Sequence, residues 1–331
     1  MNVVQRCAGL LVAGGCVSAK ERDVLRSCEY LSCEGTPDKW RFIETSPLSK
    51  PRRGAAAGVV TSQNGQQPVA VIAGGCTGPD QHTISIESAS LSTANNEKFD
   101  KFQWQNTKLN MQQGRSCAAH MITERKMYIF GGWDGLECRN DIEIVDFNNL
   151  MSEASTEDDD SANLKLPTCL KNATAVCIGG AKYLLIGGWD GKQTLRTVFE
   201  YDLKSRTVSM TSLLPEPLEC HACAQHDGRV FIVGGYNGVG LTDRVYLLDI
   251  EHNIETLPIT LIQARECHTC NIVTDETNLR SYLLVCGGWD GYSSLDTVEI
   301  FEILPEHPYL KRLESELKLV HARQRHNAVV L

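Results

Sequence analysis

Long hydrophobic runs are missing from this chain of 331 residues, in which no apolar stretch approaches the roughly 18 residues of a membrane-spanning helix. An excess of positive charge is missing too, because 32 Lys and Arg residues stand against 41 Asp and Glu residues, giving a net charge of −9. A surface that binds nucleic acid or an anionic membrane is normally basic. These two absences argue against a membrane protein and against a nucleic-acid-binding protein.

The motifs of common catalytic sites are missing as well. The sequence contains no Gly-x-Ser-x-Gly nucleophile turn, no phosphate-binding glycine loop and no dinucleotide fingerprint. Its nine histidines and its carboxylates form no spacing that catalysis would require. We therefore expect no enzyme activity and no cofactor.

Evidence for secretion is weak. The segment Cys7–Gly15, followed by Val17-Ser18-Ala19, resembles a short signal peptide with cleavage after Ala19. We interpret it instead as a strand, because it is in register with five similar runs described below. Many of the 14 cysteines fall in expected buried strands, where a free thiol behaves as a small apolar group. The glycosylation triplet that begins at Asn172 opens an expected inner strand. We therefore expect free thiols and a cytoplasmic location.

The sequence does contain one short pattern repeated six times, an apolar run that ends in two glycines. The clearest copy is Gly131-Gly132-Trp133-Asp134-Gly135 after Met127–Phe130. The first glycines fall at positions 14, 74, 131, 187, 234 and 287, in steps of 60, 57, 56, 47 and 53 residues. A repeat of this length indicates stacked units that cannot bury their faces alone. A run that stops at two glycines indicates a buried strand that ends where the backbone passes close to a neighbour or takes a positive φ.

Each repeat carries the pattern of four strands. The strands expected after the glycines are Asp141–Phe147, Thr197–Asp202, Arg244–Asp249 and Thr297–Glu302. An outer strand follows, and then an inner strand opens the next unit, as in Cys117–Thr123, His221–His226 and His268–Thr274. Four antiparallel strands in each of six units predict an all-β, six-bladed β-propeller.

The two ends of the chain are expected to complete one blade together. Met1–Ala13 supplies only the run before the first two glycines, and Arg323–Leu331 matches the strand that normally precedes such a run. We therefore expect the last strand to complete blade one and to close the ring, which leaves only short, protected edges. The prediction is a single domain over residues 1–331.

The repeat resembles the kelch repeat, which has two glycines, then a Tyr or Asp-Gly, a later Trp, and an Arg or His that opens the next strand. The resemblance spans essentially the whole chain. Only Trp40 and Trp104 keep the late tryptophan. Looser packing is expected where other residues replace it, at Leu164, Val208, Ile254 and Tyr309. The Trp-Asp pairs do not indicate WD repeats, because those place Trp-Asp at a strand end without two glycines before it.

Two Cys-x-x-Cys spacings suggest a metal site at first sight. They are Cys220 with Cys223, and Cys267 with Cys270. On a strand, residues three apart point to opposite faces, so Cys220 and Cys223 are not expected to hold one zinc ion at about 2.3 Å each. We expect no metal at these pairs.

One acidic stretch interrupts the repeat pattern. Ser152–Ser161 contains Glu157-Asp158-Asp159-Asp160 and is interpreted as a solvated insertion between the outer strands of blade three. An acidic docking segment is the alternative interpretation.

The aromatic residues after the glycines are the best candidates for a binding surface. Loops that follow the second strands are expected to gather at one end of the ring, where several large aromatics would form an exposed patch. These aromatics are Trp133, Trp189, Tyr236 and Trp289. The alternative is that each ring packs on the adjacent blade as part of the repeat.

Basic residues are expected on the same face. The resemblance to kelch substrate receptors implies a recognition face that includes the loop leading into each innermost strand. The matching positions are Arg53, Arg115, Ser116, Glu219, Arg265 and Arg323. The arginines could bind an acidic or phosphorylated peptide by bidentate hydrogen bonds, or could instead hold loop carbonyls within the repeat. Arg139 and Arg196 follow the aromatics and are expected in the same region.

These observations predict a non-enzymatic module that binds a segment of a partner protein on one rim of the propeller. Resemblance to kelch-like BTB proteins implies substrate recognition for a cullin-type ubiquitin ligase, although the chain has no BTB module. An actin-binding or cytoskeletal scaffold is the alternative, and a kelch-fold enzyme acting on a small molecule is the second alternative.

Overall fold

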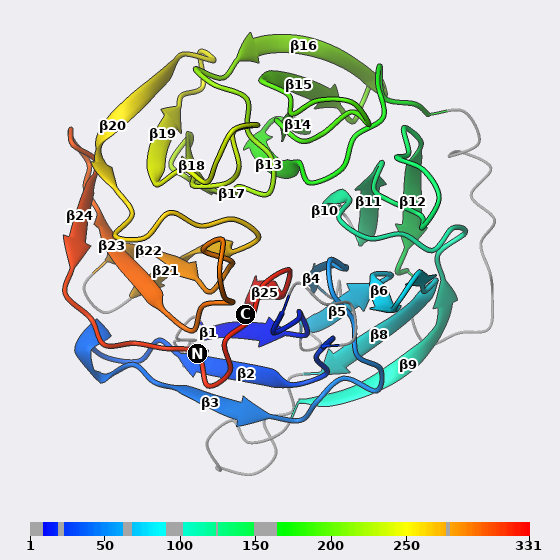
Figure 1. Ribbon diagram of the computed structural model, residues 1–331, viewed down its shortest axis with the longest axis horizontal. Coiled ribbons are helices and arrows are strands. Elements are labelled where there is room, and N and C mark those ends of the chain that lie inside the picture. Colours follow the sequence, from blue (N-terminus) through cyan, green and yellow to red (C-terminus); the bar gives the residue numbers. More distant parts are fainter. Residues whose placement is uncertain are drawn as a thin grey trace, which may run out of the picture.

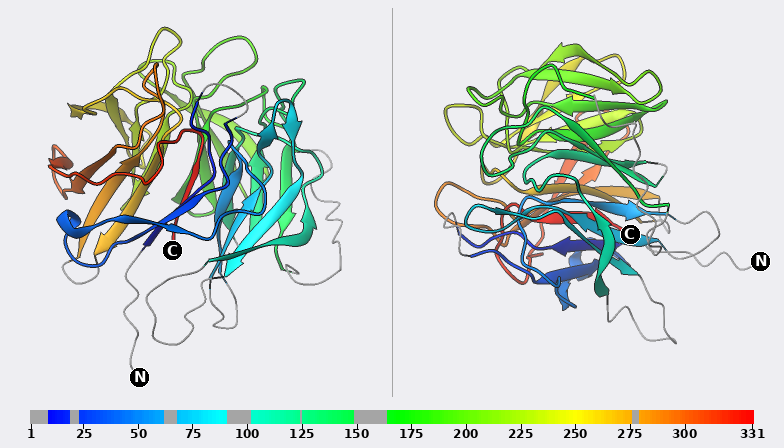
Figure 2. Two further views of the ribbon diagram at one scale, coloured as in Figure 1. Left: turned by 60° about the horizontal axis from the view of Figure 1, so that its bottom comes forward. Right: turned by 90° about the vertical axis from the view of Figure 1, so that its right-hand side faces the viewer.

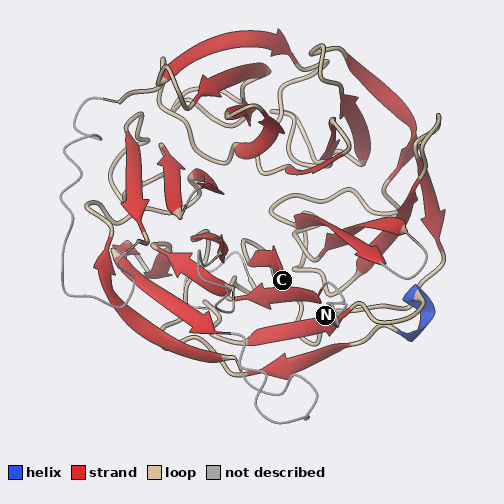
Figure 3. Cartoon of the chain, turned by 180° about the vertical axis from the view of Figure 1, so that it is seen from behind, coloured by secondary structure: helices blue, strands red, loops and turns tan. Residues whose placement is uncertain are grey.

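A computed structural model of the chain describes residues 9–18, 23–61, 68–90, 102–123, 125–148, 164–275 and 279–331. Six antiparallel sheets stand around a central axis as the blades of a propeller (Figure 1). The only helical element in these ranges is the short 3-10 turn η1 (Pro37–Lys39), drawn in blue in Figure 3. None of the described residues belongs to a helix that could cross a membrane. The prediction of an all-β, six-bladed propeller is confirmed.

The first three blades contain the two ends of the chain and the segment that follows. Blade one contains β25 (Asn327–Val330), β1 (Gly9–Ala13), β2 (Cys28–Ser32) and β3 (Phe42–Thr45). Blade two contains β4 (Ala56–Val60), β5 (Val69–Ala73), β8 (Ser85–Ser90) and β9 (Gln103–Asn110). Blade three contains β10 (Ala119–Thr123), β11 (Lys126–Phe130) and β12 (Ile142–Asp146).

The other three blades are regular four-stranded sheets. Blade four contains β13 (Thr174–Gly179), β14 (Lys182–Ile186), β15 (Thr197–Asp202) and β16 (Thr207–Leu213). Blade five contains β17 (Ala222–His226), β18 (Arg229–Val233), β19 (Arg244–Leu248) and β20 (Ile254–Thr260). Blade six contains β21 (Thr269–Asp275), β22 (Arg280–Cys286), β23 (Val298–Ile303) and β24 (Leu310–Leu313).

Two blades depart from the regular pattern. In blade three the chain returns beside β12, where Ile142 N donates to Leu164 O at 3.0 Å, while the acidic stretch Ser152–Ser161 lies outside the described residues. Blade two carries an extra hairpin after its two glycines, β6 (Cys76–Gly78) with β7 (Gln81–His82). The repeat pattern did not predict this hairpin.

The hydrophobic core is divided among the interfaces between blades. A strand in the middle of a blade packs against both neighbouring blades, so it is apolar on both faces, as in β14, where Tyr183–Ile186 is buried throughout. In the described part of the chain, one cluster of buried residues lies between each neighbouring pair of blades. Between blades one and six, the Trp40 ring meets Tyr282 edge-on with centroids 5.5 Å apart.

The ring is closed by the C-terminal strand, as the sequence predicts. β25 pairs antiparallel with β1, with Leu10 opposite Val330 and Ala13 opposite Asn327. The two ends of the described chain therefore lie in the same sheet, which Figure 2 shows from two further directions. The strand interpretation of Leu10–Ala13 is confirmed, because this run is β1 and pairs with strands on both sides.

The two glycines of each repeat fasten a blade to the next one. In blade four, Gly187 and Gly188 have φ values of 58° and 98°, and Gly188 N donates to Leu218 O of the adjoining segment at 2.7 Å. A Cβ atom on Gly187 would lie 2.3 Å from Leu218 O. Both reasons predicted for the glycines, a positive φ and a close backbone approach, hold at this position.

Candidate partner-binding face

Four aromatic residues lie on the end of the propeller where inner strands begin. Each one forms a two-way backbone bridge with the residue that leads into an inner strand. Trp133 N donates to Ser116 O at 2.8 Å, and Ser116 N donates to Trp133 O at 2.9 Å. The equivalent bridges join Lys171 to Trp189, Glu219 to Tyr236 and Glu266 to Trp289. All four aromatic side chains are partly exposed on this end, which we call the loop face.

Beneath these bridges, six residues form a closed ring of backbone hydrogen bonds around the central axis. Each has a left-handed φ between 52° and 58° and stands two positions before the first residue of an inner strand. Each backbone N–H donates to the carbonyl of the preceding member over 2.7–2.9 Å, and Gly54 accepts from Cys117 while donating to Arg325. We call this the channel ring, and its members are Gly54, Cys117, Asn172, Cys220, Cys267 and Arg325.

The predicted binding residues Arg115, Arg265 and Arg323 are 2%, 1% and 0% exposed. Each guanidinium donates to a glycine carbonyl at 2.8–2.9 Å, on Gly131, Gly287 and Gly14, in the blade whose inner strand the arginine leads into. Each also forms a buried ion pair, at 3.1, 2.9 and 2.5 Å, with Glu143, Glu299 and Glu29. These arginines act inside the fold and do not form part of the exposed surface of the loop face.

The same contacts correct the alignment of the repeats by one residue. The position of Arg115 is occupied in blade two by Arg52, whose guanidinium holds the carbonyl of Gly74 at 2.8 Å, and not by Arg53. Arg53 takes the next position, which bridges the loop as Ser116 does. Ser116 is buried, and its hydroxyl hydrogen-bonds to His82 at 3.0 Å.

Arg139 and Arg196 lie near the aromatics but are engaged within their own blades. Arg139 forms ion pairs with Asp134, Glu137 and Asp141 at 3.0–3.3 Å. Arg196 Nε donates to Leu214 O at 2.9 Å. Neither residue contacts the tryptophans through a hydrogen bond or ion pair of the described structure.

The loop face instead holds a lysine that the sequence analysis missed. The Lys171 ammonium lies 4.8 Å from the ring centroid of Trp133 and 4.4 Å from that of Trp189, where the ring quadrupoles attract it. Among the described residues it makes no ion pair. Lys171 occupies the bridging position of blade four, equivalent to Ser116 and Arg53, so aligning the repeats at that position would have found it.

A cavity of about 190 Å³ lies beside Lys171. Three basic residues line it, Arg53, Lys171 and Arg325, together with His82 and the exposed carboxylate Asp80. Arg325 Nη1 contacts Cys117 Sγ at 3.0 Å, and no carboxylate of the described chain lies within ion-pair distance of Arg325. We call this hollow the mouth cavity, since members of the channel ring line it.

Below the ring, a channel of about 340 Å³ follows the axis between the inner strands. Its wall contains small residues, thiols and the histidines His221, His268 and His326. Burial lowers the pKa of His221 to about 4, and burial with the nearby Arg323 charge lowers the pKa of His326 to about 3. Both side chains are therefore neutral imidazoles at pH 7.

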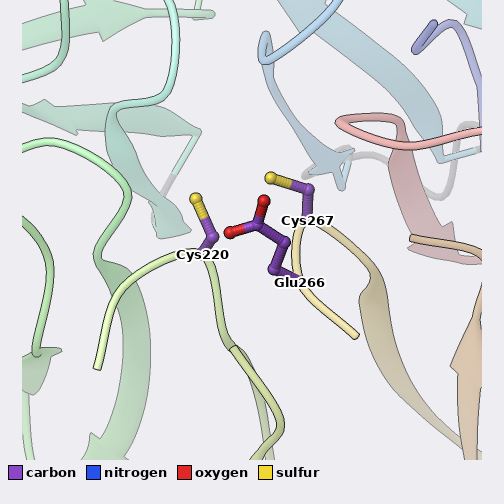
Figure 4. A group of neighbouring side chains, drawn as sticks. All are labelled: Cys220, Glu266 and Cys267. Atoms are coloured by element: carbon purple, nitrogen blue, oxygen red, sulfur yellow. The ribbon is translucent and has the colours of Figure 1, made fainter. Parts of the chain in front are cut away.

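The cysteines of the two Cys-x-x-Cys spacings do not pair within their own copy. Cys223 Sγ lies 2.9 Å from the Thr174 hydroxyl. Cys220 instead meets Cys267 and Glu266 of the next blade, where one ligand atom from each residue lies within 4.8 Å of the others (Figure 4).

The ring of sheets, the paired glycines and the bridged loops define a kelch-type propeller, a fold that serves as a protein-interaction module. The chain belongs to the KLHDC2/KLHL20/DRC7 Kelch-repeats domain family, whose model matches residues 58–277. No curated protein matches the chain. The kelch resemblance drawn from the repeats is confirmed.

Proposed function

We propose that the loop face holds a segment of a partner protein, with an acidic or phosphorylated side chain seated in the mouth cavity. The observation that carries the proposal is Lys171, a cation held between Trp133 and Trp189 without a carboxylate partner in the described chain. An ammonium group without a carboxylate partner supports recognition of an anion. A hydrogen bond from a charged donor is about twice as strong as one between neutral groups.

The charge distribution supports the same proposal. The whole chain carries −9, yet three cations line the mouth cavity and only one carboxylate, the exposed Asp80, faces them. A basic cavity on an acidic molecule still attracts anionic groups locally, because a single carboxylate offsets only part of its positive charge. Trp133 lines the cavity and Trp189 packs against Lys171, and both offer large amphipathic surfaces of the kind that interfaces use as anchors.

We propose further that the captured segment belongs to a substrate of a cullin-type ubiquitin ligase, the role implied by the resemblance to kelch-like proteins. Membership of the kelch-repeats family supports a protein partner in general. Recovery of a cullin together with the captured protein would support this role, and recovery of actin filaments would favour the scaffold alternative.

The test of the binding site is a Lys171→Met variant. Met keeps the apolar stem between the tryptophans and removes the charge. In fluorescence titrations against a panel of acidic and phosphorylated peptides, we expect the peptides that bind the intact chain to lose about tenfold or more in affinity, about 1.4 kcal/mol.

The matched control is Lys204→Met, in the exposed turn between β15 and β16. This control is expected to bind as the intact chain does. Equal peptide affinity for the Lys171 variant and the intact chain would refute the mouth cavity as the site. A pull-down with a folded Trp133→Ala, Trp189→Ala, Trp289→Ala variant, read by mass spectrometry, then identifies which protein depends on the loop face.

A further inference from the structure

Two cysteines from neighbouring blades meet a carboxylate on the channel ring. The ligand atoms of Cys220, Glu266 and Cys267 all lie within 4.8 Å of one another. Figure 4 shows the Glu266 carboxylate between the two sulfur atoms. We call these three residues the thiol–carboxylate group.

The fold holds this group in place through the backbone. Cys220 and Cys267 are adjacent members of the channel ring, and Cys267 N donates to Cys220 O at 2.8 Å. Glu266 is fastened by its two-way bridge to Trp289. The three ligand atoms are therefore brought together before any ligand binds, which reduces the entropy lost on binding.

The carboxylate of Glu266 is unengaged. It makes no hydrogen bond and no ion pair with the described residues, whereas the neighbouring Glu219 carboxylate binds Asn172 and Thr194 at 2.7 and 2.9 Å. A cation at this point would supply the partner that this carboxylate lacks.

We propose that Cys220, Cys267 and Glu266 bind one thiophilic divalent cation, of which Zn²⁺ is the natural candidate. Zinc takes thiolate and carboxylate ligands in a tetrahedral arrangement at about 2.3 and 2.0–2.2 Å, and small side-chain rotations bring ligand atoms at this separation to those distances. Three protein ligands leave the fourth position for water or for a group of a bound partner.

The charges of the three ligands, the cation and the nearby arginine add up to zero. Two thiolates and one carboxylate carry −3, the cation contributes +2, and the nearby Arg325 guanidinium contributes +1. Arg325 has no carboxylate partner of its own among the described residues, and its charge acts on both Cys267 and Glu266. The arginine therefore neutralises the remaining negative charge of the metal-bound ligands, besides competing with the metal for the free ligands.

None of the three ligands lines the mouth cavity, although Arg325 lies near both sites, and the ligands come from two repeats. The pairing joins residues 220 and 267 across the blades. It therefore makes a different prediction from a Cys-x-x-Cys site, in which Cys223 and Cys270 would also be ligands.

The test uses the full chain, kept reduced and stripped with a chelator, and titrated with Co²⁺ alone. We expect one equivalent to produce a sulfur-to-cobalt charge-transfer band, which Zn²⁺ then abolishes by displacement. Cys220→Ser and Cys267→Ser are expected to lose the band. Glu266→Gln is expected to weaken binding by about tenfold or more, since even outer-shell groups change metal affinity by 10–100-fold.

The matched control is Cys223→Ser with Cys270→Ser, which removes thiols from the same channel wall but not from the group. It is expected to keep the band and the stoichiometry. Absence of a thiolate band in the intact chain, or its loss in this control, would overturn the proposal. Circular dichroism of each variant checks that the propeller is folded, and the Glu266→Gln affinity tests the site even if a cysteine variant does not fold.

Discussion

At the scale of single residues, the chain keeps several ion pairs inside its core. Arg52–Glu87, Arg265–Glu299 and Arg323–Glu29 are pairs in which both side chains are at most 5% exposed. In each pair the arginine, on the loop that leads into an inner strand, also donates to the carbonyl of the first of the two glycines in that same blade. These charges therefore fasten the entry loop to the glycine turn, and their removal affects packing as well as electrostatics.

We expect Arg323→Met to lower the free energy of unfolding by about 3–5 kcal/mol, because it leaves the buried Glu29 carboxylate without its arginine, held only by the backbone N–H groups of Val320 and His321 and near the His321 side chain. Urea unfolding followed by tryptophan fluorescence measures this loss. The control is Arg280→Met, which removes a pair with Glu302 whose arginine is 59% exposed and is expected to cost at most about 1 kcal/mol. Equal losses for the two variants would show that the buried pair has no special role.

At the scale of elements, the inner strands are linked by repeated histidine contacts. His221 Nε2 lies 2.9 Å from the Thr174 hydroxyl of the preceding blade, and His326 Nε2 lies 3.0 Å from the Thr269 hydroxyl. Each histidine stands immediately before its inner strand, where it lines the channel. Protonation of these rings is therefore coupled to the packing of inner strands around the axis.

Stability is expected to fall as the pH falls from about 6.5 toward 4. The pKa of His221 is about 4 in the folded chain against an ordinary value of 6.5, so in this window the unfolded chain binds a proton that the folded chain does not. The His221 contribution is present above pH 6.5 and is lost at about 1.4 kcal/mol per pH unit through the window.

Comparison with His221→Gln isolates this effect, since Gln can keep the hydrogen bond to Thr174 and does not titrate. Urea unfolding at several pH values should show the difference between the two proteins changing in this window, with the intact chain losing more stability on acidification. Parallel pH profiles would contradict the assignment.

At the scale of the whole molecule, stability depends on closing the ring. β25 supplies the innermost strand of blade one, and Ala328 and Val330 pack on the cluster between blades one and six. Without it, β1 would present an apolar edge, and such edges pair with other chains.

A chain ending at His326, which lacks β25, is expected to lose about 3 kcal/mol or more from apolar burial alone and to self-associate. Thermal unfolding and size-exclusion chromatography measure these two effects. The control Val329→Ala, Val330→Ala keeps the backbone pairing and is expected to remain monomeric with a smaller loss. A truncated chain that unfolds like the intact one would show that closure is dispensable.

Much of this architecture was predictable from the sequence. The apolar runs before the glycines gave the central strands, as Tyr183–Ile186 in β14 shows, because strands buried on both faces are apolar throughout. Inner strands began later than expected, at Ala119 in place of Cys117 and at Ala222 in place of His221. The residues before them, such as Cys117 and Cys220, take a left-handed φ. The alternation of apolar and polar side chains does not reveal this conformation.

The sequence by itself determined the propeller, its six repeats and its closing strand, because these follow from the local period of apolar runs and glycines. Only the tertiary structure decided which side chains meet. The buried Arg115 and the bridging Ser116 are consecutive residues with different roles. The repeat pattern can be aligned at either position, so it does not distinguish them. Lys171 contacts one tryptophan of its own blade and one of the preceding blade, and Cys220 meets Cys267 of the next blade. The contacts between blades join residues 38 and 47 positions apart, and their distances are set by how the blades pack around the axis.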